Sequence, residues 1–118
     1  MMTKFEGRAS QMRESQWLAA EDLEGLGEVE VTIKQVNLHQ NVQVEGQPKR
    51  DRVYTLEFDG RHKEMWINAT NRKVLKMMYG DDVNAWSGKT ITIYAQDGIR
   101  VGKTTKAGIR VKFVKQEG

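Results

Sequence analysis

The sequence predicts a mainly β domain of five strands with one helix, and three observations lead to this prediction. Runs with apolar residues at alternate positions recur along the chain, which is typical of strands that bury one face. Residues 69–82 instead repeat their apolar residues at helical spacing. The pair Asp59-Gly60 lies between two alternating runs, and such a pair is a strong signal for a tight hairpin between antiparallel strands.

Length and composition predict one domain. The chain has 118 residues, of which 38% are hydrophobic, enough for a single core. It has no cysteine, which excludes disulfides and thiolate chemistry and fits a reducing cytoplasm. A run of about 18 apolar residues is absent, and so is a secretory signal. We therefore expect a cytoplasmic protein with no membrane partner, a flexible arm over residues 1–16 and one domain over residues 17–118.

The first strand is expected over residues 28–39, after a short apolar turn or helix that Gly25 and Gly27 end. Its apolar residues change parity after Ile33, so we expect a bulge or sharp coil there, as in strands that bend around a small barrel. Residues 40–51 contain the only proline and predict a long loop.

The next two strands form the predicted hairpin. A two-residue turn at Asp59-Gly60 places Phe58 opposite Arg61 and Val53 opposite Trp66. One face is then apolar and faces the core, whereas Trp66 lies on the outer, polar face, where His62 is opposite Glu57. The predicted core face consists of Tyr54, Leu56, Phe58, Met65 and Ile67.

The helix is followed by two more strands. Thr70 is a candidate N-cap, and Gly80 supplies the left-handed stop. Trp86 is assigned mainly to the core beside the helix. Strand 89–95 follows, then a glycine-rich basic loop over residues 96–108, then a last strand that begins at Ile109.

This order of elements predicts an architecture. Five strands with a bent first strand and a helix between strands three and four describe a Greek-key barrel of the oligonucleotide- and oligosaccharide-binding type, the OB-fold. An α+β roll with the same elements is the alternative.

Several spaced motifs also resemble a known group. The segments "EDL", "VEVTIKQV", "MWINATNRKVLKMMYGDDVNAWSGKTITIY" and "GIRVK" are similar to those of small, mostly uncharacterised proteins encoded by phages and prophages. In that group an N-x-T-N segment leads into a helix ending in Tyr-Gly, followed by an acidic turn and W-x-G-K. The resemblance covers roughly residues 17–112. It implies an OB-like fold in the cytoplasm of a phage-infected or lysogenic bacterium, and it implies function only loosely.

Enzymatic motifs are missing from the sequence. The tripeptide Gly88-Lys89-Thr90 lacks the earlier glycine and the following helix of a phosphate-binding loop. The two histidines, His39 and His62, do not have metal-ligand spacing, and no serine lies in a nucleophile elbow. We expect no enzyme, no cofactor and no metal.

Charge favours a nucleic-acid ligand. Residues 1–48 hold four Lys or Arg against eight Asp or Glu, whereas residues 49–118 hold fifteen against eight. In the predicted barrel, basic loops flank a face on which Trp66 can stack with a base. Tyr94 is a second stacking candidate. The cations expected to contact phosphate are Lys49, Arg50, Arg52, Lys89, Arg100, Lys103, Lys106 and Lys112.

The expected ligand is single-stranded nucleic acid, with DNA preferred, in phage replication or recombination. Replication or recombination proteins and a second copy of the chain are further candidate partners. Glu57 and Glu64 share the outer face with Trp66 and would repel phosphate. An exposed tryptophan is also common at protein contacts, so a protein-interaction or assembly module is the alternative function.

Overall fold

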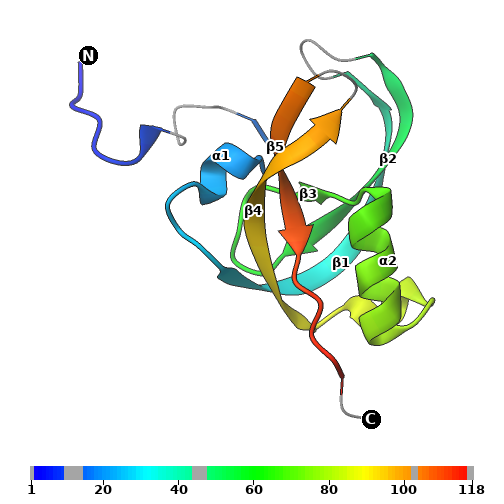
Figure 1. The fold of residues 1–118 in the computed structure, drawn as a ribbon. Helices are drawn as coiled ribbons and strands as arrows, with labels where there is room; N and C mark the ends of the chain where they lie inside the picture. The colour runs from blue at the N-terminus through cyan, green and yellow to red at the C-terminus, as the bar shows by residue number, and fades with distance from the viewer. Residues whose placement is uncertain (1, 10–14, 44–47, 102–103, 117–118) are drawn as a thin grey trace.

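The computed structural model is mainly β, with a five-stranded antiparallel sheet and one main helix (Figure 1). It describes residues 2–9, 15–43, 48–101 and 104–116, and only the backbone of residues 98–101 and 104–106. The strand order is β3-β2-β1-β4-β5. The elements are α1 (Ala20–Leu23), β1 (Val29–Val42), β2 (Arg50–Phe58), β3 (Met65–Trp66), α2 (Ala69–Tyr79), the 3-10 helix η2 (Val83–Trp86), β4 (Thr90–Val101) and β5 (Thr104–Val111).

The sheet is not closed, so the predicted Greek-key barrel is not confirmed. The outer strands β3 and β5 do not pair within the described residues. Instead α2 lies against β5: the Asn71 side chain donates a hydrogen bond to the Ile109 carbonyl at 2.9 Å and accepts one from the Val111 amide at 3.0 Å. The helix thus occupies the open edge of the sheet. The short helix α1 lies in the segment that was expected to form a short turn or helix, whereas η2 was not predicted as a separate element.

The predicted bend in β1 is confirmed. Its pairing register with β2 shifts between Ile33 and Gln35, at the change of parity in the sequence. Residues 29–32 pair with β4, whereas residues 33–42 pair with β2. Because of the shift, apolar side chains before and after it face the same core.

The predicted register between β2 and β3 is wrong by two residues. Thr55, not Val53, pairs with Trp66, and Leu56 pairs with Met65. The turn itself forms, since the Arg61 amide donates to the Phe58 carbonyl and Gly60 has a φ of +69°. A shift of two residues keeps each side chain on its predicted face.

An N-terminal segment explains this shift. The backbone of Glu64 hydrogen-bonds to residues 16 and 18 at 2.9 and 2.8 Å, which forms a parallel bridge at Trp17. The residues after the turn therefore pair with the N-terminal segment before the chain joins β2.

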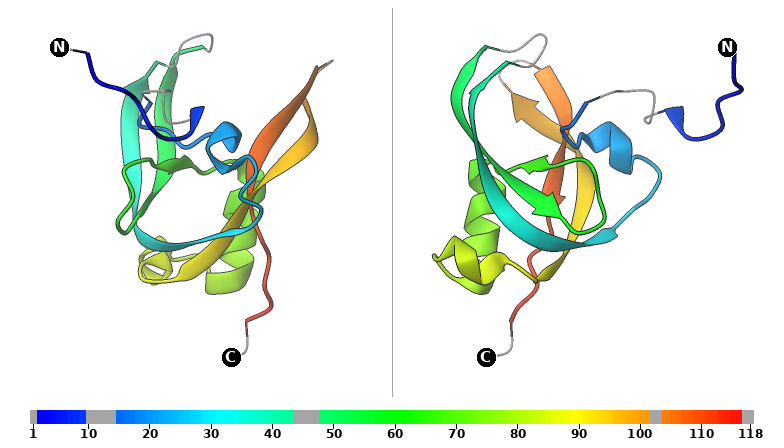
Figure 2. Two further views of the ribbon diagram at one scale, coloured as in Figure 1. Left: turned by 90° about the vertical axis from the view of Figure 1, so that its left-hand side faces the viewer. Right: turned by 180° about the vertical axis from the view of Figure 1, so that it is seen from behind.

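The loops predicted over residues 40–51 and 96–108 are shorter in the structure, because the strands on either side extend into them. Strand β1 extends to Val42 and β2 begins at Arg50. The predicted basic loop over residues 96–108 is mostly hairpin, because β4 extends to Val101 and β5 begins at Thr104, with a register shift between Gln96 and Ile99. The β1–β2 and β4–β5 hairpins extend toward the same end of the molecule, opposite the C-terminal tail (Figures 1 and 2).

The core lies between the curved sheet and α2. Its most deeply buried apolar residues come from β1, β2, β3, α2 and β4. Trp86 is 3% exposed, as predicted, and its Nε1 donates to the Gly80 carbonyl at 2.9 Å. The fully buried apolar side chains are Ile33, Leu56, Met65, Leu75 and Ile93.

Asn68, not Thr70, is the N-cap of α2. Its Oδ1 accepts a hydrogen bond from the Asn71 amide at 2.8 Å, which satisfies one of the free amides of the first turn. Gly80 ends the helix with a φ of +95°, as predicted. The two asparagines of the segment "NATN" therefore have separate roles: Asn68 caps the helix, and Asn71 joins it to β5.

Candidate nucleic-acid interface

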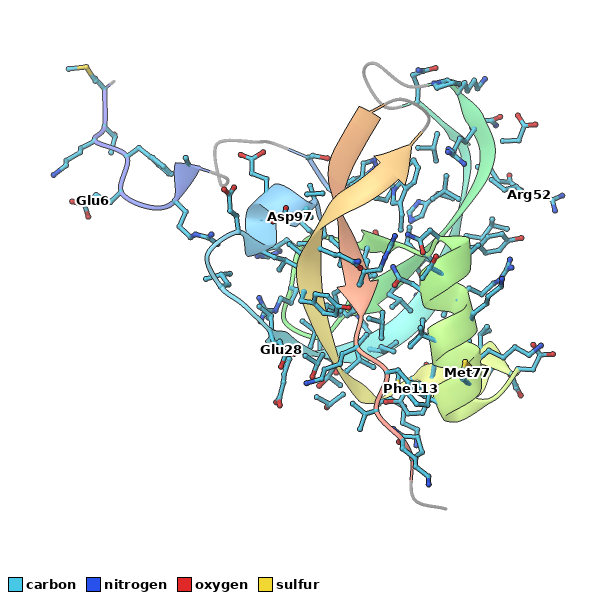
Figure 3. The ribbon with its side chains drawn as sticks, in the orientation of Figure 1. Glu6, Glu28, Arg52, Met77, Asp97 and Phe113 are labelled. Atoms are coloured by element: carbon cyan, nitrogen blue, oxygen red, sulfur yellow. The ribbon has the colours of Figure 1, made fainter. Side chains whose placement is uncertain are left out.

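Three of the predicted cations lie together on the β1–β2 hairpin. Lys49 directly precedes β2, and Arg50 and Arg52 are the first and third residues of that strand. All three are exposed, and within the described residues none forms an ion pair with a carboxylate. Figure 3 shows Arg52 pointing outward from β2. These cations are therefore available to an anionic ligand.

Tyr54 and Leu38 form an exposed apolar pair beside Arg52. Tyr54 is 49% exposed and Leu38 is 48% exposed, and the two residues are directly paired between β2 and β1. Arg52 and Gln40 form the next cross-strand pair of β2 and β1 whose side chains lie on the same side of the sheet as Tyr54 and Leu38. The prediction that Tyr54 is a core residue is therefore wrong.

The exposure of this pair has a simple cause. Strand β4 pairs only with residues 29–32 of β1, so the later part of the β1–β2 hairpin extends beyond that neighbour. The face that is buried at Leu56 becomes exposed at Tyr54, two residues closer to the hairpin end. Alternation in the sequence identifies the face of a residue but not where along a strand its cover ends.

Trp66 lies on the predicted outer face but is not an open platform. The Trp17 ring packs edge-on against it, with 5.7 Å between ring centroids, and the Arg50 guanidinium lies 5.6 Å from its ring centroid. The Trp66 Nε1 is buried and has no hydrogen-bond partner among the described residues. The N-terminal segment thus covers part of the surface on which we expected a base to stack.

A polar network lies on the same outer face. The Glu64 Oε1 accepts hydrogen bonds from Asn37 Nδ2 at 3.0 Å and Thr55 Oγ1 at 2.6 Å, and it lies 2.9 Å from His39 Nε2. The predicted pair of His62 with Glu57 does not form, because of the register shift. Glu57 instead pairs with Lys34 at 3.2 Å. The two carboxylates are therefore bound to protein donors and are not free to interact with a ligand.

The lowered pKa of the Glu64 carboxyl group predicts that the stability of the protein depends on pH. Burial by itself would raise the pKa of Glu64, but the hydrogen bonds from Asn37, Thr55 and His39 together outweigh it and lower the pKa below its ordinary value of 4.5. A lowered pKa in the folded state stabilises the protein above the unfolded pKa, and that stabilisation is lost as the pH falls through the folded value.

We expect Glu64→Gln to lower the free energy of unfolding by about 1.5–3 kcal/mol near neutral pH, the range for hydrogen bonds to charged groups. The difference from wild type should shrink as the pH falls below about 4.5. Urea unfolding followed by circular dichroism at several pH values measures it. Glu30→Gln, on an exposed residue of β1, should follow wild type at every pH. A Glu64 effect that is constant with pH would contradict the expectation.

The other predicted site residues do not all gather at the hairpin ends. Lys89 is exposed at the start of β4, with its Nζ 5.6 Å from the Tyr79 ring centroid, and Lys112 pairs with Glu28 at 3.0 Å beyond the end of β5. Tyr94 is half-buried in β4, opposite Arg110.

The cations of the β4–β5 hairpin are placed only by their backbone. Arg100 and Lys106 lie in strands near the hairpin end, opposite Thr105 and Ile99, and their side chains are outside the described residues. Lys103 is outside them altogether. The structure therefore brings Lys49, Arg50 and Arg52 together, and it separates them from Lys89 and Lys112.

No protein-family model matches the chain, and no curated protein or solved structure is significantly similar to it. In the part of the chain that the structure describes, no helix is long and apolar enough to cross a membrane. The same residues contain no group of three or more His, Asp or Glu side chains arranged to hold a metal ion. The fold and its surface are thus the basis for a functional proposal.

Proposed function

We propose that the protein binds single-stranded nucleic acid without enzymatic activity, and that its ligand is single-stranded DNA. The observation that carries this proposal is the half-exposed Tyr54 on a strand whose neighbouring cations, Lys49, Arg50 and Arg52, have no carboxylate partner among the described residues. Proteins that bind single strands combine an aromatic ring, on which a base stacks, with cations along the phosphate backbone. Tyr54 replaces Trp66 as the principal stacking residue.

The topology supports the same proposal. The order β3-β2-β1-β4-β5 is the order of a five-stranded OB barrel that is opened between its third and fifth strands. In OB-folds, the loops after the first and fourth strands flank the ligand, and the two corresponding hairpins here extend toward one end (Figure 2). Arg100, Lys103 and Lys106 would add charge from the second hairpin. The resemblance to phage proteins suggests replication or recombination as the setting.

We expect Tyr54→Ala to weaken binding of a labelled oligo-dT by about 1–3 kcal/mol, the usual contribution of one stacked base. Tyr54→Phe should bind nearly as well as wild type, because it keeps the ring. Fluorescence anisotropy at about 50 mM salt measures the affinity. Phe113→Ala is the matched control: Phe113 is also 49% exposed but lies on the C-terminal tail, remote from Arg52 (Figure 3).

The same titration at increasing salt tests the cations. Arg52→Gln should reduce the slope of log affinity against log salt by about 0.7, the change for one phosphate contact to a single strand. Absence of binding to any single strand at low salt would refute the proposal. An equal loss of oligo-dT affinity in Tyr54→Ala and Phe113→Ala would refute the assignment of the binding site to Tyr54.

A protein-interaction module is the second candidate, because Leu38 adds an exposed aliphatic side chain directly beside Tyr54, and aromatic residues are enriched at protein interfaces. This function predicts self-association or partner binding that Tyr54→Ala abolishes and Arg52→Gln leaves unchanged. Analytical ultracentrifugation of the same variants distinguishes it from nucleic-acid binding.

A further inference from the structure

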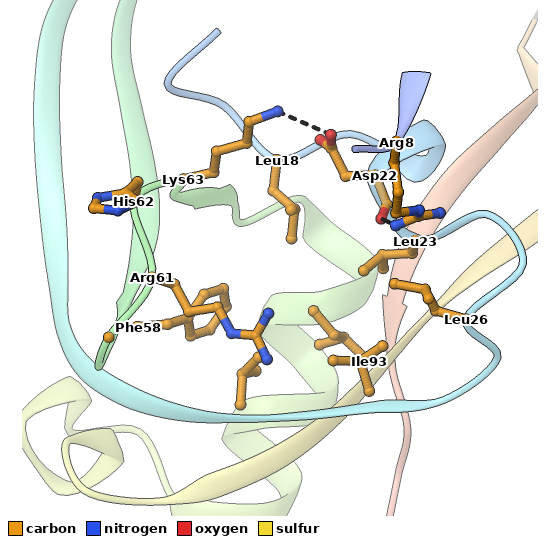
Figure 4. A pocket seen from close by; sticks show the side chains of 13 residues that line it. Arg8, Leu18, Asp22, Leu23, Leu26, Phe58, Arg61, His62, Lys63 and Ile93 are labelled. Carbon is orange, nitrogen blue, oxygen red and sulfur yellow. Dashed lines mark hydrogen bonds and ion pairs between the residues drawn. The ribbon is translucent and has the colours of Figure 1, made fainter. Parts of the chain in front are cut away.

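A cavity lies between α1 and the sheet, on a different part of the molecule from the hairpin ends (Figure 4). Its volume is about 430 Å³, within the range of small-molecule sites. Its floor is apolar: Leu23, Val31, Phe58 and Ile93 are each at most 5% exposed. Leu18 and Leu26 continue the apolar lining toward the mouth. The short helix α1 therefore leaves unfilled space above an otherwise packed core.

The charged side chains around this cavity differ in whether they have partners. Among the described residues that line the cavity, Asp22 is the only carboxylate, and it pairs with Lys63 at 2.8 Å across the mouth. The Arg8 guanidinium donates hydrogen bonds to the carbonyl oxygens of Asp22 and Glu24. These groups are thus neutralised or bound at the rim.

Arg61 is different. Figure 4 shows its guanidinium directed into the cavity, between Phe58 and Ile93. Within the described residues this side chain makes no ion pair and no hydrogen bond. Arg61 is an exposed residue, so its guanidinium is open to a ligand that enters from solvent, and a carboxylate can accept two parallel hydrogen bonds from it.

We propose that this cavity binds a small amphipathic carboxylate, with its apolar body against Leu23, Phe58 and Ile93 and its carboxylate on the Arg61 guanidinium. One unpaired cation favours a single negative charge. A fully polar anion would leave the apolar floor uncovered, and a neutral apolar molecule would make no use of the Arg61 guanidinium. The proposal is independent of nucleic-acid binding, because the two surfaces share no residue named for either.

Decanoate is the probe, titrated below its micelle concentration into the full chain by isothermal calorimetry. We expect saturable one-to-one binding, and amide shifts in ¹H–¹⁵N spectra at Leu23, Phe58 and Ile93. Decanol, which lacks the charge, should bind with an affinity at least about tenfold lower. Arg61→Gln should weaken decanoate by about tenfold or more, as expected for loss of a hydrogen-bonded charge partner, and should leave the affinity for decanol nearly unchanged.

Two further variants make the test specific. Leu26→Asp places an anion at the mouth and should abolish decanoate binding; Leu26 is 49% exposed, so this variant is expected to fold. Arg52→Gln removes an exposed arginine outside the cavity and should bind decanoate like wild type. Equal affinities for decanoate and decanol, an unaltered affinity in Arg61→Gln, or shifts confined to Leu38 and Tyr54 would each overturn the proposal. So would binding of an apolar peptide C-terminus with no binding of the free acid.

Discussion

Replacing Asn71 by alanine is expected to lower the free energy of unfolding by about 2–4 kcal/mol, because two hydrogen bonds between α2 and β5 are lost together. The Asn71 side chain is 1% exposed. Its removal leaves the Val111 amide without its acceptor and leaves the Ile109 carbonyl with only the long hydrogen bond from Arg110 Nη1 at 3.4 Å, and a buried unpaired group costs more than a hydrogen bond contributes. Denaturant unfolding followed by circular dichroism measures the change.

Two neighbouring substitutions are controls for this prediction. Asn68→Ala removes the N-cap bond to the Asn71 amide and should cost about 1 kcal/mol. Thr70→Ala, at an exposed position of the same first turn, should change stability by less than about 0.5 kcal/mol. If Thr70→Ala were as damaging as Asn71→Ala, the join between α2 and β5 would not be the cause of the loss.

Trp17→Ala is the second substitution with a large expected effect, a loss of about 3 kcal/mol, at the low end of the range for buried tryptophan. Trp17 is 8% exposed, and its ring packs edge-on against His39, at 5.1 Å between centroids, and against Trp66. Without it the N-terminal segment keeps its two backbone hydrogen bonds to Glu64 but loses the ring contacts with His39 and Trp66.

Fluorescence and denaturant unfolding together test this prediction. Trp17→Ala should expose Trp66 and shift the emission to longer wavelength, and it should lower the unfolding midpoint. Trp17→Phe should recover most of the stability, because a ring remains in contact with His39 and Trp66. Met77→Ala, on a side chain of α2 that is 69% exposed, should change neither quantity. An unchanged midpoint in Trp17→Ala would mean that the segment does not stabilise the domain.

Removal of Trp17 also bears on the functional proposal. The N-terminal segment covers part of the outer face around Trp66, whereas Tyr54 lies on the other side of β2. Oligo-dT binding through Tyr54 should therefore survive in Trp17→Ala at temperatures where the variant is folded. A gain in affinity on removal of Trp17 would instead favour the originally expected platform at Trp66.

The parts of the fold that were predictable from sequence are those set by neighbouring residues. The parity change after Ile33 predicted the bulge in β1, and Gly80 predicted the end of α2, because each depends on the geometry of a few consecutive residues. Asp59-Gly60 likewise predicted a turn. The register beyond that turn was not predictable, because Glu64 pairs with a segment more than forty residues earlier in the chain.

Some residues of the candidate site were likewise predictable from sequence, and others were not. Lys49, Arg50 and Arg52 were predicted from their charge and from their place at the end of the loop expected after the first strand, and residues so close in sequence also lie close together in the structure. Tyr54 was assigned to the core, because alternation does not reveal that β4 stops short of this part of β1. The cavity beside Arg61 carries no sequence signal, because its walls come from four separate elements.

The sequence by itself therefore determined the order of the strands and the main helix, where the first strand bends, and which side of each strand is apolar, because these features follow from local periodicity and turn chemistry. It did not determine where the strands end, because β1, β4 and β5 extend into residues predicted as loops. Only the tertiary structure decided how far each apolar face is covered. It joined α2 to β5 through Asn71, packed Trp17 against Trp66, and placed Arg61 at an apolar cavity. Those three placements depend on contacts between distant segments, whose energies no local pattern records.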